Sequence, residues 1–157
     1  MKTKSLSSRL LSILALLTFT AALAAPALAQ AGRISVASQH SFDQTVGALK
    51  SAVGQGGMMV MGTVDQGNML SMTGLRLKAT LFLIGNPTVG KKLFEQDHAV
   101  GLYVPLRVFV YEDKDGKTYV TYDKPSELLA PLNNQEIDQT AQMLDHKLDS
   151  LVQMVAH

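Results

Sequence analysis

The feature that most restricts the fold of this chain is a predicted β-hairpin in its second half. Two strand-like runs, at residues 102–111 and 117–122, flank the polar segment 112–116. This segment ends in an Asp-Gly pair, which is a strong hairpin signal because glycine adopts the positive φ that a tight turn requires. The sequence therefore predicts a sheet in which at least two strands are antiparallel neighbours.

Three further strands and three helices are predicted from hydrophobic periodicity. Ser41 with Gln44, and Asn133 with Glu136, have the spacing of capping boxes at helix starts. The order of elements predicts a single α+β domain, with a mostly antiparallel sheet and helices on one face. Strands are expected at 33–38, 58–64 and 75–84, and helices at 41–53, at 88–97 and from Asn133 or Asn134 towards residue 155, with a short helical turn at 69–74.

The first 29 residues have the three parts of a secretory signal peptide. Lys2, Lys4 and Arg9 form a basic start, residues 10–23 are uncharged and mostly apolar, and Ala27 and Ala29 form an A-x-A cleavage pattern. The apolar part is shorter than the roughly 20 residues that a membrane-spanning helix needs. We expect a signal-peptide helix at 1–29 that is removed, followed by one domain at 30–157.

Charge and cysteine content limit the partners and the location of the mature chain. Removing the three basic residues of the leader leaves 11 of the 14 Lys and Arg residues against 13 Asp and Glu residues. A slightly acidic surface gains little from displacing counterions, so nucleic acid is excluded as a partner. The chain has no cysteine, which excludes disulfides and thiol catalysis but is compatible with export. We expect a periplasmic or secreted protein with no membrane partner after cleavage.

Residues 85–91 match the GxxxxGK pattern of a phosphate-binding loop and lie between a predicted strand and a predicted helix. Lys92 stands where that loop needs a Ser or Thr to bind magnesium, so a nucleotide site is rejected. A weaker hypothesis is that the first backbone N–H groups of the helix, beside Lys91 and Lys92, hold a small anion or carboxylate. The alternative is a simple corner with two solvated lysines.

Methionine and histidine raise the question of a metal site. Thioether sulfur suits Cu(I), but methionine is also a flexible core filler, and the spacing of Met59 and Met61 is that of a buried strand. We expect the clustered methionines to pack in the core, and they are Met58, Met59, Met61, Met69 and Met72. The histidines show no metal-ligand spacing, and they are His40, His98, His146 and His157. The sequence therefore predicts no metal and no cofactor.

The hairpin concentrates aromatic and cationic side chains. Arg107, Phe109 and Tyr111 alternate along one strand, so they share one face. Such a face could line an apolar pocket or a dimer interface, and we expect it to pack under a helix.

The order and spacing of several short motifs resemble the domain of unknown function 302 family over nearly all of the mature chain. The resemblance implies a two-layer α/β sandwich, commonly dimeric, with no assigned reaction. Members often carry histidine directly after the Asp that ends the second strand, whereas here Gln66 follows Asp65, which predicts a lost or altered function if that histidine serves a ligand. The motifs are 41–45, 85–87, Leu102 with 105–108, 111–113 with 115–117, and 120–122 before Pro125; the positions carried across are Asp65, Asn86, Pro105, Arg107 and Tyr122.

Together these observations predict an exported domain that binds a small ligand or a partner protein, as a homodimer and without chemistry of its own. No residue is assigned to catalysis or to a metal. One alternative is an enzyme that uses Asp65, Arg107 and a tyrosine in a pocket, and a further alternative is a metal or haem binder built from distant histidines. The predicted ligand-binding residues are Asp65, Asn86, Lys91, Arg107 and Tyr122.

Overall fold

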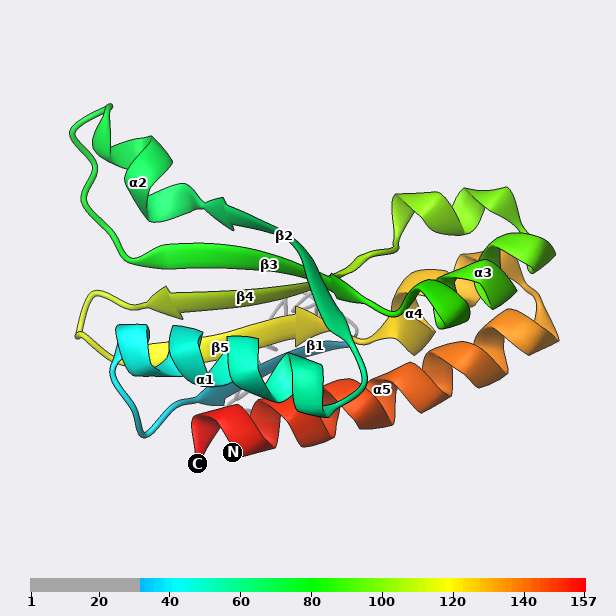
Figure 1. The fold of residues 1–157 in the computed structure, drawn as a ribbon. Helices are drawn as coiled ribbons and strands as arrows, with labels where there is room; N and C mark the ends of the chain where they lie inside the picture. The colour runs from blue at the N-terminus through cyan, green and yellow to red at the C-terminus, as the bar shows by residue number, and fades with distance from the viewer. Residues whose placement is uncertain (1–31) are drawn as a thin grey trace, which may run out of the picture.

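A five-stranded antiparallel sheet forms one layer of the molecule (Figure 1). The computed structural model describes residues 32–157, so the predicted signal peptide at 1–29 lies outside the described residues. Across the sheet the strand order is β1-β5-β4-β3-β2. The strands are β1 (Arg33–Ala37), β2 (Met59–Asp65), β3 (Ala79–Gly85), β4 (Leu106–Glu112) and β5 (Thr118–Asp123).

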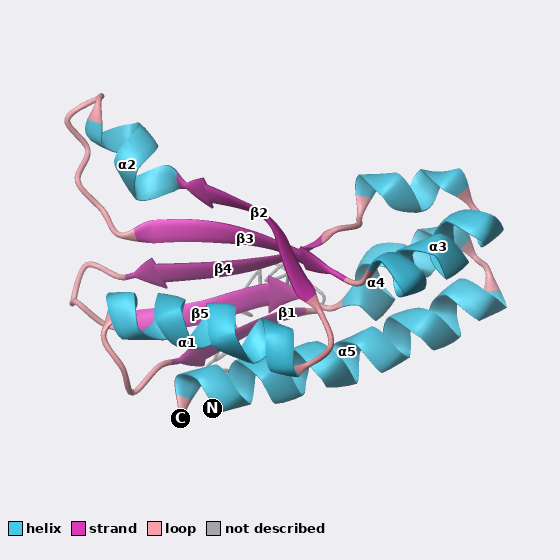
Figure 2. Cartoon of the chain, in the orientation of Figure 1, coloured by secondary structure: helices cyan, strands magenta, loops and turns pink. Residues whose placement is uncertain are grey.

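Two long helices, α1 (Phe42–Gln55) and α5 (Gln135–Ala156), lie side by side on one face of this sheet (Figure 2). Helix α3 (Pro87–Gln96) packs beside α5, and the short α4 (Pro125–Leu129) leads towards it. Helix α2 (Gln66–Ser71) projects beyond the end of the sheet with the β2–β3 connection. The α+β sandwich with helices on one face is therefore confirmed. None of the helices between residues 32 and 157 is both long and apolar enough to span a bilayer.

The hydrophobic core lies between the sheet and the two long helices. Alternation along β4 directs Leu106, Val108 and Val110 towards the helices, and all three are nearly fully buried. On α5 the apolar stripe includes Leu144 and Leu148, as the helical period requires. Burial of each such side chain contributes about 1.5–3 kcal/mol. The sheet face turned away from the helices is called the open face below.

Two polar caps set the starts of the long helices. Ser41 and Gln44 form the predicted capping box, with the Ser41 N–H donating to Gln44 Oε1 at 3.1 Å. The second predicted box is wrong. Asn134 is the N-cap of α5, and its Oδ1 accepts from Ile137 and from the residue before it. Asn133 instead adopts a left-handed conformation with φ of 49°, which asparagine tolerates better than most residues.

The hairpin is confirmed, but three predicted boundaries move. The strand expected from residue 75 begins at Ala79. The strand expected from Leu102 begins at Leu106, because Leu102 ends a 3-10 turn at residues 98–102. Helix α2 starts earlier than the predicted turn because Asp65 Oδ1 accepts the Asn68 N–H at 2.8 Å. Pro125, expected only to end β5, also starts α4, since its fixed φ suits the first helical turn.

The expected core packing of the clustered methionines is wrong for four of the five. Met58 is buried, but Met59, Met61, Met69 and Met72 are 50%, 48%, 54% and 86% exposed. The physical reason is that β2 is an edge strand with a register shift between Val60 and Gly62. Alternation then no longer assigns its side chains to a buried face, and α2 projects away from the core.

Candidate functional site

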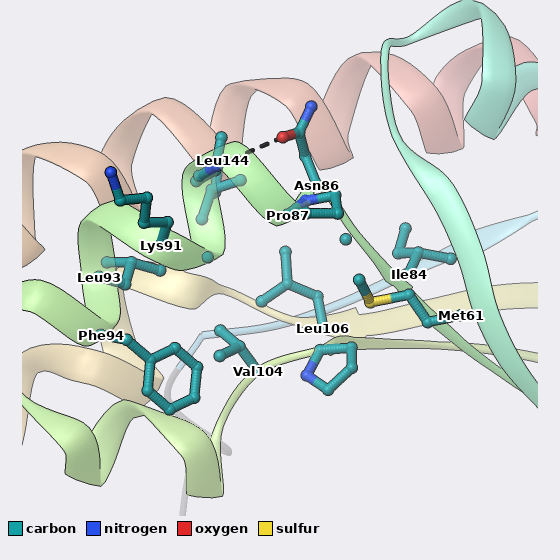
Figure 3. Close-up of a pocket in the computed structure, with 14 residues that line it drawn as sticks. Met61, Ile84, Asn86, Pro87, Lys91, Leu93, Phe94, Val104, Leu106 and Leu144 are labelled. Atoms are coloured by element: carbon teal, nitrogen blue, oxygen red, sulfur yellow. Dashed lines mark hydrogen bonds between the residues drawn. The ribbon is translucent and has the colours of Figure 1, made fainter.

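An apolar pocket of about 340 Å³ lies beneath α3 (Figure 3). Its inner wall consists of core side chains, including Ile84, Leu93 and Leu106. Met61 and Phe94 stand at the mouth and are 48% and 41% exposed. Val104, Pro105, Val89 and Leu144 complete the apolar lining. The pocket therefore offers a solvent-accessible cavity in which almost every contact is hydrophobic.

The turn between β3 and α3 shapes this pocket. A Cβ on Gly85 would lie 3.2 Å from Met61 Sδ, so glycine allows the methionine to lie close over the end of the strand. Asn86 is the N-cap of α3: its Oδ1 accepts from Thr88 N at 2.8 Å and more weakly from the following N–H. Its Nδ2 donates to Gly57 O at 2.8 Å. Asn86 thus positions α3 rather than presenting a free polar group.

These hydrogen bonds bear on the anion hypothesis. Pro87 has no N–H, Thr88 and Val89 donate to Asn86 Oδ1, and Gly90 donates to Asn86 O. The ammonium of Lys91 is exposed and lies 3.4 Å from the Glu95 carboxylate. The first-turn donors are engaged within the chain, so the geometry favours the alternative reading, a corner with solvated lysines.

A second, shallower hollow of about 600 Å³ lies on the open face. Arg107, Phe109 and Tyr111 line it, together with Gln66. The expectation that these hairpin side chains pack under a helix is wrong, because Val108 and Val110 take the helix-facing positions of β4. The rings of Phe109, Tyr111 and Tyr119 stack in a row, with centroid separations of 5.3 and 5.4 Å.

The remaining predicted residues lie elsewhere. Asp65 caps α2 through its carboxylate. Although Tyr122 borders the hollow, the alternation of β5 directs its side chain into the core, where it is almost fully buried. Burial, reinforced by the charges of Asp149 and Asp145, raises the pKa of Tyr122 to about 12. The structure therefore places Asn86 and Lys91 at the pocket and Arg107 at the hollow, and does not bring the five residues into one site.

Sequence reasoning did not predict Met61, Phe94 or Val104 as ligand-binding residues, and it named Pro105 only as a position shared with the family pattern; all four line the pocket. They come from β2, α3 and the segment before β4. The one local signal for the pocket is Phe94, a large apolar residue of α3 that is not buried. In the described part of the chain no three His, Asp or Glu side chains gather closely enough to hold a metal ion.

Known proteins resemble parts or most of this chain. An uncharacterized conserved protein DUF302 from Bacillus stearothermophilus matches with a TM-score of 0.74 at 19% identity, over 79% of this chain and 98% of that one. "Fluoride-specific ion channel FluC 1" of Brucella suis biovar 1 (strain 1330) is 33% identical over 96 residues, or 60% of this chain and 38% of that protein. "Fluoride-specific ion channel FluC 2" of Brucella melitensis biotype 1 is also 33% identical over 96 residues, which make up 36% of that protein. The chain thus spans less than two fifths of these curated relatives.

The structural match supports the fold, and the partial channel matches concern only a segment of those proteins. The family model described as "Domain of unknown function DUF302" matches residues 34–155, which is nearly the whole of the described chain. The motif resemblance is therefore confirmed, and the chain belongs to the DUF302 family.

Proposed function

We propose that this domain binds a small apolar molecule in the pocket beneath α3 and does not transform it chemically. The observation that supports the proposal is the pocket itself: about 340 Å³, lined almost entirely by apolar groups and open at Met61 and Phe94. Ligand sites commonly occupy about 300–1,000 Å³ and are mainly apolar. A ligand that covers the two half-exposed mouth residues would remove apolar surface from water.

The polar groups near the pocket narrow the ligand class. The Asn86 amide is occupied by the helix cap and by Gly57, and the Lys91 ammonium lies beside Glu95. Recognition would then depend on shape and hydrophobic contact, with the flexible Met61 side chain adapting to the ligand. This favours an uncharged, mostly aliphatic or aromatic molecule over an anion.

A pocket-filling variant tests the proposal. Gly90 lies on α3 and lines the pocket, and a Cβ there meets no atom within 4 Å. Gly90→Leu should therefore place apolar bulk in the cavity, starting from a Cβ that has open space around it. Gly47→Leu is the matched control, because Gly47 is also a helical glycine with open space around its Cβ but lies on α1. Both changes replace a glycine within a helix, which is expected to raise helix stability.

The measurement is the thermal stabilisation of the protein by n-alcohols of increasing chain length. Ligands that bind only the native state raise the Tm by mass action. We expect the wild type and Gly47→Leu to gain stability with chain length until the pocket is full, and Gly90→Leu to gain much less. Equal stabilisation of all three proteins would mean that the alcohols do not bind in this pocket.

The channel relatives favour a second candidate function. Proteins named as fluoride channels contain a segment 33% identical to this chain, so the domain is proposed to act beside a membrane ion channel. Fluoride efflux from vesicles that contain such a channel, measured with and without this chain, tests the idea. A changed efflux rate would support it, and an unchanged rate with no association would count against it.

We also propose that the mature protein is exported to the periplasm or secreted, on the basis of the signal-peptide pattern in residues 1–29.

We further propose that the protein is a homodimer joined through β2. Edge strands are commonly protected by Lys or Pro, whereas β2 contains neither and exposes Met59, Val60 and Met61. Antiparallel pairing of two β2 strands would continue the sheet across both copies. In light-scattering measurements Met59→Lys should give a monomer, while Met72→Lys should stay dimeric; a monomeric wild type would refute the dimer.

A further inference from the structure

We propose a second binding site, on the open face, for a small organic anion with a flat apolar body. It would lie in the hollow of about 600 Å³ that Arg107 borders. The site is distinct from the pocket beneath α3, and its ligand carries the charge that the pocket does not accommodate. The proposal therefore does not depend on the proposed function.

The first argument is that the Arg107 guanidinium lacks a carboxylate partner. Val108 pairs with Tyr122 across β4 and β5, so the antiparallel register sets Arg107 opposite Asp123. Both oxygens of Asp123 are already engaged by Arg33, with Nε–Oδ1 at 2.7 Å and Nη2–Oδ2 at 3.2 Å. Within residues 32–157 no carboxylate lies within 4 Å of Arg107, and residues 1–31 contain no Asp or Glu.

The second argument is the floor beside this cation. Leu81 and Phe109 face each other across β3 and β4, and Tyr111 stacks on Phe109. These side chains are half-buried on a sheet face turned away from α1 and α5. A planar apolar body placed on them would be shielded from water on one side.

The third argument is that the rim is positive overall, because Asp123, the carboxylate that lines the hollow, is already paired with Arg33. Ser35 and Thr121 hydrogen-bond to each other through their hydroxyls at 2.7 Å, and Gln66 contributes a neutral amide. The charged groups that line the hollow are Arg33, Asp123 and Arg107, with a net charge of +1. A cation at one end, an apolar floor and neutral donors at the side suit a carboxylate attached to a ring.

Arginine favours this ligand class for geometric reasons. Its planar guanidinium donates two parallel N–H bonds to one carboxylate, a pairing that lysine cannot reproduce. Benzoate combines that carboxylate with a flat apolar ring, so it is a suitable probe. Benzyl alcohol keeps the ring without the charge, and acetate keeps the charge without the ring.

The experiment measures binding of these three probes to the purified protein by NMR titration. Benzoate should bind more tightly than either partial probe and should shift the resonances of Leu81 and Phe109. Arg107→Gln should weaken benzoate binding about tenfold to a hundredfold, as expected for loss of a charged hydrogen-bonding partner, and Arg107→Lys should be intermediate. Arg107 is exposed, so both variants should fold, and Arg76→Gln, an exposed arginine outside the hollow, should match the wild type.

Three results would overturn the proposal: no benzoate binding, equal binding of benzoate and benzyl alcohol, or unchanged affinity in Arg107→Gln. Shifts confined to Phe94 and Val104 would place benzoate in the pocket beneath α3 and would also refute it. The two proposals can fail separately. Gly90→Leu should leave benzoate binding intact, and Arg107→Gln should leave the stabilisation by alcohols intact.

Discussion

The amide of Asn86 donates to the carbonyl of Gly57 at 2.8 Å, which ties the start of α3 to the turn that follows α1. The same side chain caps α3 through Oδ1. One residue therefore joins two segments 29 positions apart and sets the position of the helix that covers the pocket.

This double role makes Asn86 a sensitive position. Asn86→Ala should lower the free energy of unfolding by about 1–2 kcal/mol, because it removes both the cap and the link to Gly57. Asn86→Asp keeps an oxygen for the cap but loses the donor to Gly57, so it should lower the free energy of unfolding by less than Asn86→Ala does. Urea denaturation measures both values, and equal losses in the two variants would contradict the separate contributions assigned here.

Tyr122 should make stability depend on alkaline pH. Its native pKa of about 12 exceeds the value near 10 of an unfolded chain, so the native state keeps the proton after the unfolded state has lost it. The free energy of unfolding should fall as pH rises from about 10 to 12. Tyr122→Phe should lack this part of the decline in urea denaturation at several pH values. Parallel curves for the two proteins would show that the buried phenol does not titrate as described.

Asp145 on α5 caps a different helix. The N-cap residue of α4, Lys124, makes no side-chain cap bond, and Asp145 accepts hydrogen bonds from both the N–H and the hydroxyl of Ser126. Asp145→Ala should lower the free energy of unfolding, measured by urea denaturation, by about 1.5–3 kcal/mol, the range for hydrogen bonds to a charged group. Asp149→Ala, on an exposed position of the same helix, is the control. A similar small loss in both variants would argue against the capping role.

Gly67 is required where α2 lies against the strand that follows it. A Cβ at this position would come within 2.5 Å of Leu77 O and 3.3 Å of Ala79 N, and these backbone atoms cannot move aside cheaply. Gly67→Ala should therefore destabilise the protein by about 1–3 kcal/mol. Gly54→Ala, where a Cβ meets open space, should be neutral or stabilising in thermal unfolding. Full tolerance of the Gly67 change would mean that α2 can shift freely.

Local sequence patterns predicted most of the helices and strands, but not every residue at which a helix begins. The Asp-Gly turn, the Ser41 capping box and the apolar stripe of α5 depend on neighbouring residues, and these features are present. Asn133 and Asn134 offered two adjacent caps, and only the tertiary path of the chain selects between them. Here the sequence pattern was sufficient for the helix but not for its first residue.

The two candidate sites were harder to predict because each depends on which surface is covered. Alternation places Arg107 and Phe109 on the same face, but it does not say whether that face meets the helices. Likewise, Met61 and Phe94 line one pocket although they lie on β2 and on α3, two elements that do not follow each other in the chain. Such contacts are long-range, so no spacing along the chain indicates them.

The account rests on occupancy of the pocket beneath α3 by an apolar molecule, and intermolecular NOEs test this most directly. The protein would carry labelled methyl groups, with a saturating n-alcohol as the probe. We predict NOEs from the alcohol chain to the methyls of Leu93, Val104 and Leu106, which line the pocket, and their loss in Gly90→Leu. NOEs only to Leu81 and Leu83 on the open face, or none at all, would contradict the central claim.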